Sequence, residues 1–147
     1  MSRRPAFTII ELMIAVSIIA ILTGIAAVSY SGIQQRGRDA SRKNDLSQVK
    51  VALSSYYASQ IPAVYVTSAT AATINGSTDS VSTTLSPNYI KTVPVDPFNT
   101  GSYVYKYQSF NSAKSFKLFG TLENKNDTKG WGSGSAWVAD GYILQDE

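Results

Sequence analysis

An uncharged apolar run near the N-terminus constrains this chain more than any other feature. Between Phe7 and Tyr30 the only formal charge is Glu11. A helix needs about 20 apolar residues to cross the hydrocarbon core of a membrane. A secretory signal peptide has a shorter apolar region, of about 7–15 residues. The rest of the 147-residue chain is polar and too small to bury such a helix. The run therefore predicts a membrane-spanning helix.

Glu11 is the anomaly within this run. A carboxylate inside a spanning helix costs a few kcal/mol, and it is usually kept for a function with a partner. Two interpretations follow from the residues alone. In the first, Glu11 lies close enough to the start of the run to reach headgroup water. In the second, it meets a positive charge that another subunit supplies.

The composition excludes most catalytic chemistry. The chain has no cysteine and no histidine, so it lacks disulfides, thiol chemistry, the commonest general base and the commonest zinc ligand. It also has no phosphate-binding glycine loop and no serine in a nucleophile context. A net charge of +3 makes nucleic acid only a weak candidate partner. The sequence predicts no enzyme, no cofactor and no metal.

Basic residues flank the apolar run on both sides, so charge leaves its orientation open. Arg3 and Arg4 favour a cytoplasmic N-terminus. The basic cluster after the run favours a cytoplasmic location for the C-terminal end of the run instead. A solvated helical face is the simplest interpretation of this second cluster. Anionic lipid headgroups, acids of a neighbouring subunit and DNA are alternative partners. The cluster contains Arg36, Arg38, Arg42, Lys43 and Lys50.

The helix is predicted to continue beyond the membrane. Residues 33–60 contain no proline, and apolar side chains recur at spacings of three and four, which is typical of one helical face. This packing stripe contains Leu46, Val49, Leu53 and Tyr56. Pro62 would end the helix. We therefore predict one helix over residues 7–60, with residues 7–30 as its membrane-spanning part.

The remaining chain, residues 61–147, predicts a small β domain. We expect a variable loop over 61–100. Within it, residues 67–84 are rich in Ser and Thr and contain the turn-forming pair Asn75-Gly76, which is compatible with either thin β-structure or an exposed loop. Aromatic and β-branched residues over 103–107 and 116–119 predict strands. A further strand is expected near 137–138 or 142–144. The predicted fold is α+β: a long N-terminal helix whose amphipathic half packs on a small antiparallel sheet within 101–147.

The segment PAFTIIELMIAVSIIAIL resembles the class III signal of type IV pilins and type II secretion pseudopilins. In that family a basic leader precedes a cleavage site, a Phe, a Glu at mature position five and an apolar helix. The resemblance implies a leader over residues 1–6, cleavage between Ala6 and Phe7, and N-methylation of Phe7. Two features depart from the family. Ala6 replaces the usual Gly, and no proline lies between Pro5 and Pro62.

The resemblance also implies function and partners. A prepilin peptidase would free the Phe7 amine, and Glu11 would pair with the Phe7 amine of a neighbouring copy. The subunit would enter the bacterial cytoplasmic membrane with its N-terminus in the cytoplasm. An assembly platform and an ATPase would then polymerise it into a surface filament for adhesion, twitching motility or DNA uptake. The alternatives are a pseudopilin in a periplasmic pseudopilus and an anchored domain that never polymerises.

Two features of the C-terminal part favour the pseudopilin among these alternatives. The run Pro94-Val95-Asp96-Pro97-Phe98 resembles a loop of major pseudopilins, and the chain has no cysteine pair at its C-terminus. Major pseudopilins often hold calcium in their C-terminal loops. The oxygen-bearing candidates here would be Asn124, Asp127 and Asp140, which fit solvated turns equally well. No metal site is therefore predicted.

Overall fold

A single long helix, α1, runs over Ile9–Ser59. The computed structural model describes residues 7–125 and 141–145. Two compact units divide the chain, one up to Gln35 and one from Arg36 onward, and α1 contributes to both. The helix begins after Thr8 and ends shortly before Pro62, which cannot continue a helix. Its bounds agree with the predicted 7–60 to within two residues at the start and one at the end.

A four-stranded antiparallel sheet follows in the second unit, with strand order β1-β2-β3-β4. The strands are β1 Ala72–Ile74, β2 Tyr105–Phe110, β3 Ser115–Thr121 and β4 Gly141–Gln145. The pairing sets Tyr107 opposite Leu118, and Leu118 opposite Leu144. β4 occupies the second of the two predicted positions; the first, at 137–138, lies outside the described residues. The α+β arrangement is confirmed.

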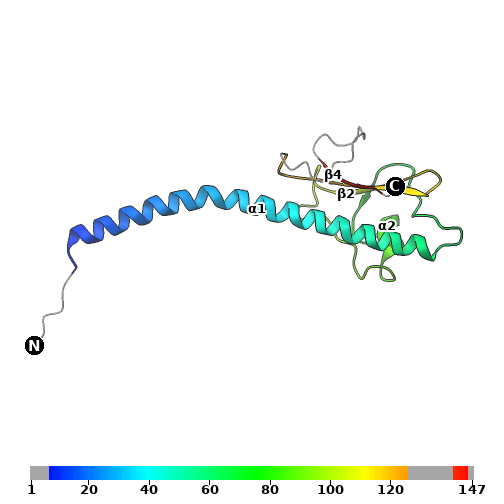
Figure 1. Cartoon of the computed structure of the whole chain (residues 1–147), viewed down its shortest axis with the longest axis horizontal. Coiled ribbons are helices and arrows are strands. Elements are labelled where there is room, and N and C mark those ends of the chain that lie inside the picture. The colour runs from blue at the N-terminus through cyan, green and yellow to red at the C-terminus, as the bar shows by residue number, and fades with distance from the viewer. Residues whose placement is uncertain (1–6, 126–140, 146–147) are drawn as a thin grey trace, which may run out of the picture. The chain divides into compact units, whose positions relative to one another are not determined.

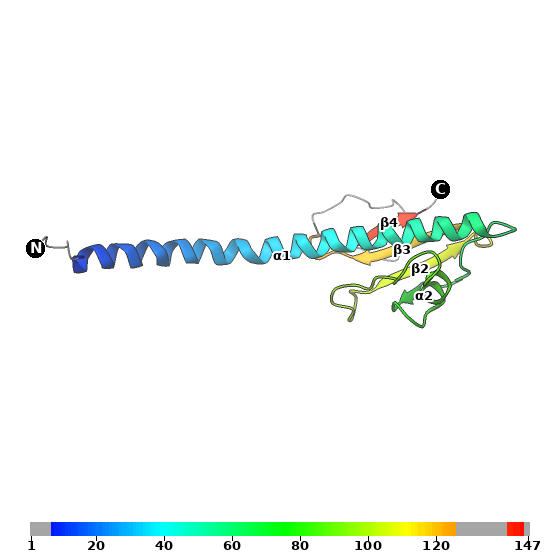
Figure 2. The ribbon, with the colours of Figure 1, turned by 90° about the horizontal axis from the view of Figure 1, so that it is seen from below.

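The core lies between the sheet and the C-terminal part of α1, as Figures 1 and 2 show. Tyr105, Tyr107 and Leu118 from the strands are completely buried there. Gly120 allows the close approach, because a Cβ at this position would lie 2.9 Å from Cδ1 of Leu46. The apolar helix stripe and alternating strand residues therefore build one core.

The structure has two regular elements within the predicted variable loop over 61–100. They are strand β1 and a short helix, α2 Ser80–Leu85. The Asp79 carboxylate caps α2 by accepting the backbone N–H groups of Val81 and Ser82. Val81 and Leu85, four residues apart, are buried in the core. Strand β1 agrees with the thin β-structure that the sequence left open. The helix α2 was not predicted, because serine and threonine dominate the segment and conceal this apolar pair.

The turn preference of Asn75-Gly76 suggested a hairpin between two strands. In the structure the pair instead lies between β1 and α2. The Asn75 Oδ1 atom accepts the backbone N–H groups of Ser77, Thr78 and Asp79, and so shapes the approach to α2. Gly76 has a φ of 79°, and a Cβ there would lie 2.8 Å from Val95 Cγ1. Glycine is required at this turn for both reasons.

Candidate functional site

Thr8 and Glu11 form a reciprocal cap at the start of α1. The Thr8 backbone N–H and hydroxyl donate to Glu11 Oε2 at 2.8 and 2.7 Å, and the Glu11 N–H donates to Thr8 Oγ1 at 3.3 Å. This is a capping box, in which side chains satisfy N–H groups that have no helical partner. Thr8-Ile9-Ile10-Glu11 carries its sequence signature, a Thr followed three residues later by a Glu. This local role of Glu11 was not predicted from the sequence, because only the charge of its side chain was interpreted.

The second carboxylate oxygen of Glu11, Oε1, takes no part in this cap. Both Thr8 donors bind Oε2, and Oε1 accepts no hydrogen bond from the residues that the structure describes. Phe7, just before the cap, is 90% exposed. Ala6 and the leader lie outside the described residues, so only the Phe7 side of the predicted cleavage site is seen. Pairing of Glu11 with a neighbouring Phe7 amine involves a second copy and stays a prediction.

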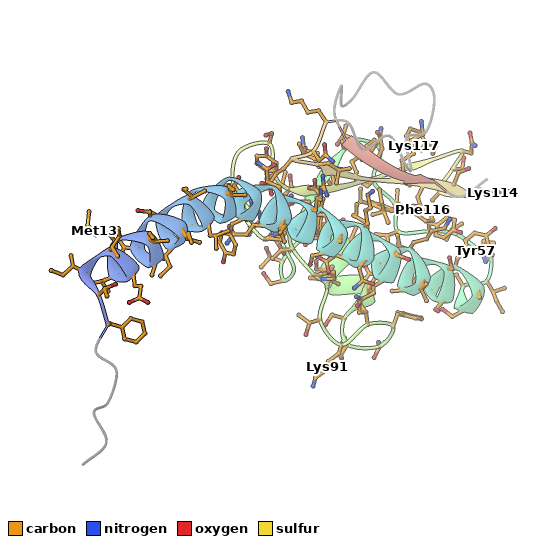
Figure 3. The ribbon with its side chains drawn as sticks, turned by 60° about the vertical axis from the view of Figure 1, so that its left-hand side comes forward. Met13, Tyr57, Lys91, Lys114, Phe116 and Lys117 are labelled. Carbon is orange, nitrogen blue, oxygen red and sulfur yellow. The ribbon has the colours of Figure 1, made fainter. Side chains whose placement is uncertain are left out.

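The first part of α1 exposes its apolar side chains on all sides. Their exposed fractions between residues 9 and 25 run from 52% at Ile18 to 80% at Ile9. Figure 3 shows Met13 extending outward from this segment. Among the described residues, α1 is the one helix long and apolar enough to cross a membrane. An apolar surface of this extent marks contact with lipid or with other protein chains.

The predicted packing stripe lies on the sheet side of α1. Leu46, Val49 and Leu53 are completely buried in the core, and Tyr56 packs against it half-buried. The Tyr56 ring meets the Tyr89 ring edge to face, with 5.5 Å between centroids. These four residues therefore attach the second half of the helix to the domain.

The basic cluster after the apolar run is not a simple solvated face, because Arg42 is completely buried. Its Nε donates to Asp96 Oδ2 at 2.7 Å, and its Nη1 donates to Asp39 Oδ1 at 2.8 Å and Glu123 Oε1 at 2.7 Å. Arg36, in contrast, is exposed. The sequence could not reveal this arrangement, because Asp96 and Glu123 lie 54 and 81 residues from Arg42.

Arg38 extends this ion cluster toward the surface. Its guanidinium binds Glu123 with two hydrogen bonds, of 2.7 and 2.6 Å. The Asp39 carboxylate accepts the backbone N–H groups of Glu123 and Asn124 at 3.0 and 2.9 Å. Together these bonds join α1 to the 94–98 turn and to the chain that follows β3. The ion cluster, defined as Arg38, Asp39, Arg42, Asp96 and Glu123, therefore fixes three segments against each other.

Charges in the ion cluster shift the ionisation of its members. Burial by itself would lower the pKa of Arg42, but the hydrogen bonds to Asp96, Glu123 and Asp39 raise it above its ordinary value. The hydrogen bonds from Arg38, with those from Arg42, lower the pKa of Glu123 to about 2 although its burial opposes this. The Arg42 guanidinium and the Glu123 carboxylate are therefore both charged at neutral pH.

Glu123 is expected to make the folded domain sensitive to acid. Its pKa is depressed on folding, so its contribution to stability is present above the ordinary value of 4.5 and is lost as the pH falls from about 5 toward 2. In thermal unfolding experiments in detergent, the full chain should therefore lose stability as the pH falls from about 5 to about 2. In Glu123→Gln the stability at neutral pH should be lower and this loss smaller. Equal pH slopes for the two proteins would contradict the assignment.

The calcium candidates do not meet in the described part of the chain. Asn124 uses its backbone N–H for Asp39, as given above, while Asp127 and Asp140 lie outside the described residues. Within residues 7–125 and 141–145 no group of three His, Cys, Asp or Glu side chains is placed to hold a metal ion. The carboxylates of the ion cluster surround the Arg42 guanidinium instead.

Residues 1–27 match the family model of the prokaryotic N-terminal methylation motif. This motif is the class III signal of type IV pilins and pseudopilins, and it confirms the resemblance found from the sequence. The motif and the apolar helix together fit a membrane-anchored, pilin-like structural protein. No curated protein and no solved structure matches the chain.

Proposed function

We propose that this chain, which carries the N-terminal methylation motif over residues 1–27, is a structural subunit that polymerises through α1 into a type IV pilus-like filament. Prepilin peptidase would cleave between Ala6 and Phe7, and the methylated Phe7 would become the N-terminus. An assembly platform and its ATPase would move the subunit from the cytoplasmic membrane into a filament on the cell surface. That filament would serve adhesion, twitching motility or DNA uptake.

The state of Glu11 is the observation that carries this proposal. Its Oε2 is used inside the chain by Thr8, whereas its Oε1 has no partner among the described residues. In the apolar core of a filament, an unpaired Glu11 charge would cost several kcal/mol. A neighbouring Phe7 amine would supply the missing donor. Apolar packing between copies of the 9–25 segment would supply most of the cohesion.

A pseudopilin of a type II secretion system is the second candidate. The observation that favours it is the Pro94–Phe98 run, in which Asp96 is completely buried against Arg42 and its Oδ1 accepts the Phe98 N–H at 2.9 Å. The turn thus has a defined structure rather than that of a freely variable loop. Such a subunit would form a short periplasmic filament instead of a surface one.

Mass spectrometry of the N-terminus, combined with shearing of intact cells, tests the proposal. We expect the mature chain to begin at N-methylated Phe7 and to be abundant in the sheared surface fraction. A processed chain that stays in the cell envelope would favour the pseudopilin. An uncut chain beginning at Met1 and remaining monomeric would contradict both candidates and favour a plain membrane anchor.

A further inference from the structure

An open groove of about 400 Å³ lies beside the turn between β2 and β3. One wall is the chain at 67–69 and the other is the turn at 109–113. Backbone bonds join the two walls: the Ser109 N–H donates to the Ser68 carbonyl at 2.9 Å, and the Tyr65 N–H donates to the Ala113 carbonyl at 2.7 Å. The Ser68 N–H also donates to Ser109 Oγ at 2.7 Å. The groove is therefore built on a fixed frame, and its volume is within the range of small-molecule sites.

The wall formed by the turn is conformationally unusual. Asn111, Ser112 and Ala113 all have left-handed backbone, with φ values of 51°, 55° and 60°. Each such residue other than glycine costs about 1 kcal/mol or more. Strain of this kind persists where the surrounding structure holds it, and it is common at ligand sites. Here the bonds from Tyr65 and Lys114 hold the turn.

Polar side chains along the groove are exposed and accessible to a ligand. The hydroxyls of Thr67 and Ser112 and the amide oxygen of Asn111 form no hydrogen bond with any residue in the described ranges, whereas Asn111 Nδ2 donates to Ser115 Oγ at 3.0 Å. The half-buried Phe110 ring adds an apolar surface. Two hydroxyls, an amide oxygen and an aromatic ring match the alternating hydroxyl and C–H faces of a sugar.

The charge beside the groove is positive. Lys114 belongs to the turn and is exposed, and Lys117 Nζ lies 5.2 Å from the centroid of the Phe110 ring. Strands β1–β4 contain no acidic residue. The carboxylates within residues 36–125 all accept hydrogen bonds from the chain itself; they are Asp39, Asp45, Asp79, Asp96 and Glu123. Among the described residues, neither Lys114 nor Lys117 forms an ion pair with a carboxylate.

We propose that this groove binds an acidic sugar unit of a glycan. Thr67, Asn111 and Ser112 would hydrogen-bond the sugar hydroxyls, and the Lys114 and Lys117 ammonium groups would meet its carboxylate. Nucleic acid fits less well, because it needs a longer basic track than two lysines beside a small groove. The inference does not depend on polymerisation, since all of its residues come from one copy.

Binding by the full, unassembled chain in detergent micelles tests this inference. Titration calorimetry would compare two acidic probes, sialyllactose and digalacturonate, with neutral lactose. We expect at least one acidic probe to bind, and lactose to bind at least about tenfold more weakly. The double change of Lys114→Gln with Lys117→Gln should weaken the acidic probe by about tenfold, and Thr67→Val should weaken it without removing charge.

Lys91→Gln is the matched control, because Lys91 is also exposed but lies away from the sheet, on the other side of α1 in Figure 3. It should leave binding unchanged, and circular dichroism should show all variants folded. Failure of both acidic probes to bind, or equal binding of lactose, would overturn the proposal. So would loss of binding in Lys91→Gln, or a short DNA duplex that binds in a lysine-dependent way while the sugars do not.

Discussion

Glu11→Gln is expected to lower filament yield at least about tenfold while membrane insertion stays normal, as the cost of an unpaired buried charge requires. Glutamine at the third helical position can still serve a capping box, so the start of α1 should survive. The substitution removes only the negative charge that the proposal assigns to a neighbouring Phe7 amine. Glu11→Ala removes both the cap and the charge; it should insert into the membrane normally but assemble poorly. The comparison therefore separates the local role of Glu11 from its role between subunits.

Quantification of sheared filaments and of membrane-bound subunit measures this effect. Ser17→Ala is the matched control, because it also removes a polar group from the apolar segment, but one whose hydroxyl bonds the Met13 carbonyl of its own helix at 2.7 Å. Its filament yield should stay near that of the unmodified chain. Polymers that persist at full yield in Glu11→Gln would remove the basis of the proposed assembly contact.

Arg42→Met should destabilise the domain by about 3–5 kcal/mol, because it leaves buried carboxylates without their shared cation. Methionine retains an unbranched apolar stem, so the loss is mainly of charge. After the change, Asp96 keeps no arginine partner and Glu123 keeps only Arg38. A loss of this size is a large share of the 5–15 kcal/mol that typically separates folded from unfolded domains. The 94–98 turn should lose its attachment to α1 first.

Chemical unfolding of the full chain in detergent, followed by aromatic fluorescence, measures this loss. Arg36→Met, on the exposed side of the same helix, is the control and should change stability by less than about 0.5 kcal/mol. The difference between Arg42→Met and the unmodified chain should shrink as the pH falls from about 4.5 toward 2, because Glu123 loses its attraction to Arg42 when it is protonated. A pH-independent difference, or losses of equal size at Arg36 and Arg42, would contradict the assigned role of the ion cluster.

Local chemistry made the helical part of the fold predictable. The apolar run, the proline-free stretch after it and the stripe of Leu46, Val49 and Leu53 each follow from residues close together in sequence. The capping box could have been predicted too, since Thr8 and Glu11 are only three residues apart and carry its signature. The short helix α2 and strand β1 were harder to predict. Their few apolar residues stand among serines and threonines, and only the folded core shows which of them are buried.

Sequence alone determined that this chain begins with a membrane-length helix bearing the methylation motif, because hydropathy, length and a fixed spacing from Phe7 to Glu11 are properties of adjacent residues. Tertiary structure alone decided that Arg42 is a buried cation, because its partners Asp96 and Glu123 come from distant segments that meet only after folding. It likewise decided where the groove at the β2–β3 turn lies, since its two walls are far apart in the chain. Short-range patterns indicate which secondary structure a segment prefers. Burial and ion pairing depend on which distant residues the fold places next to that segment.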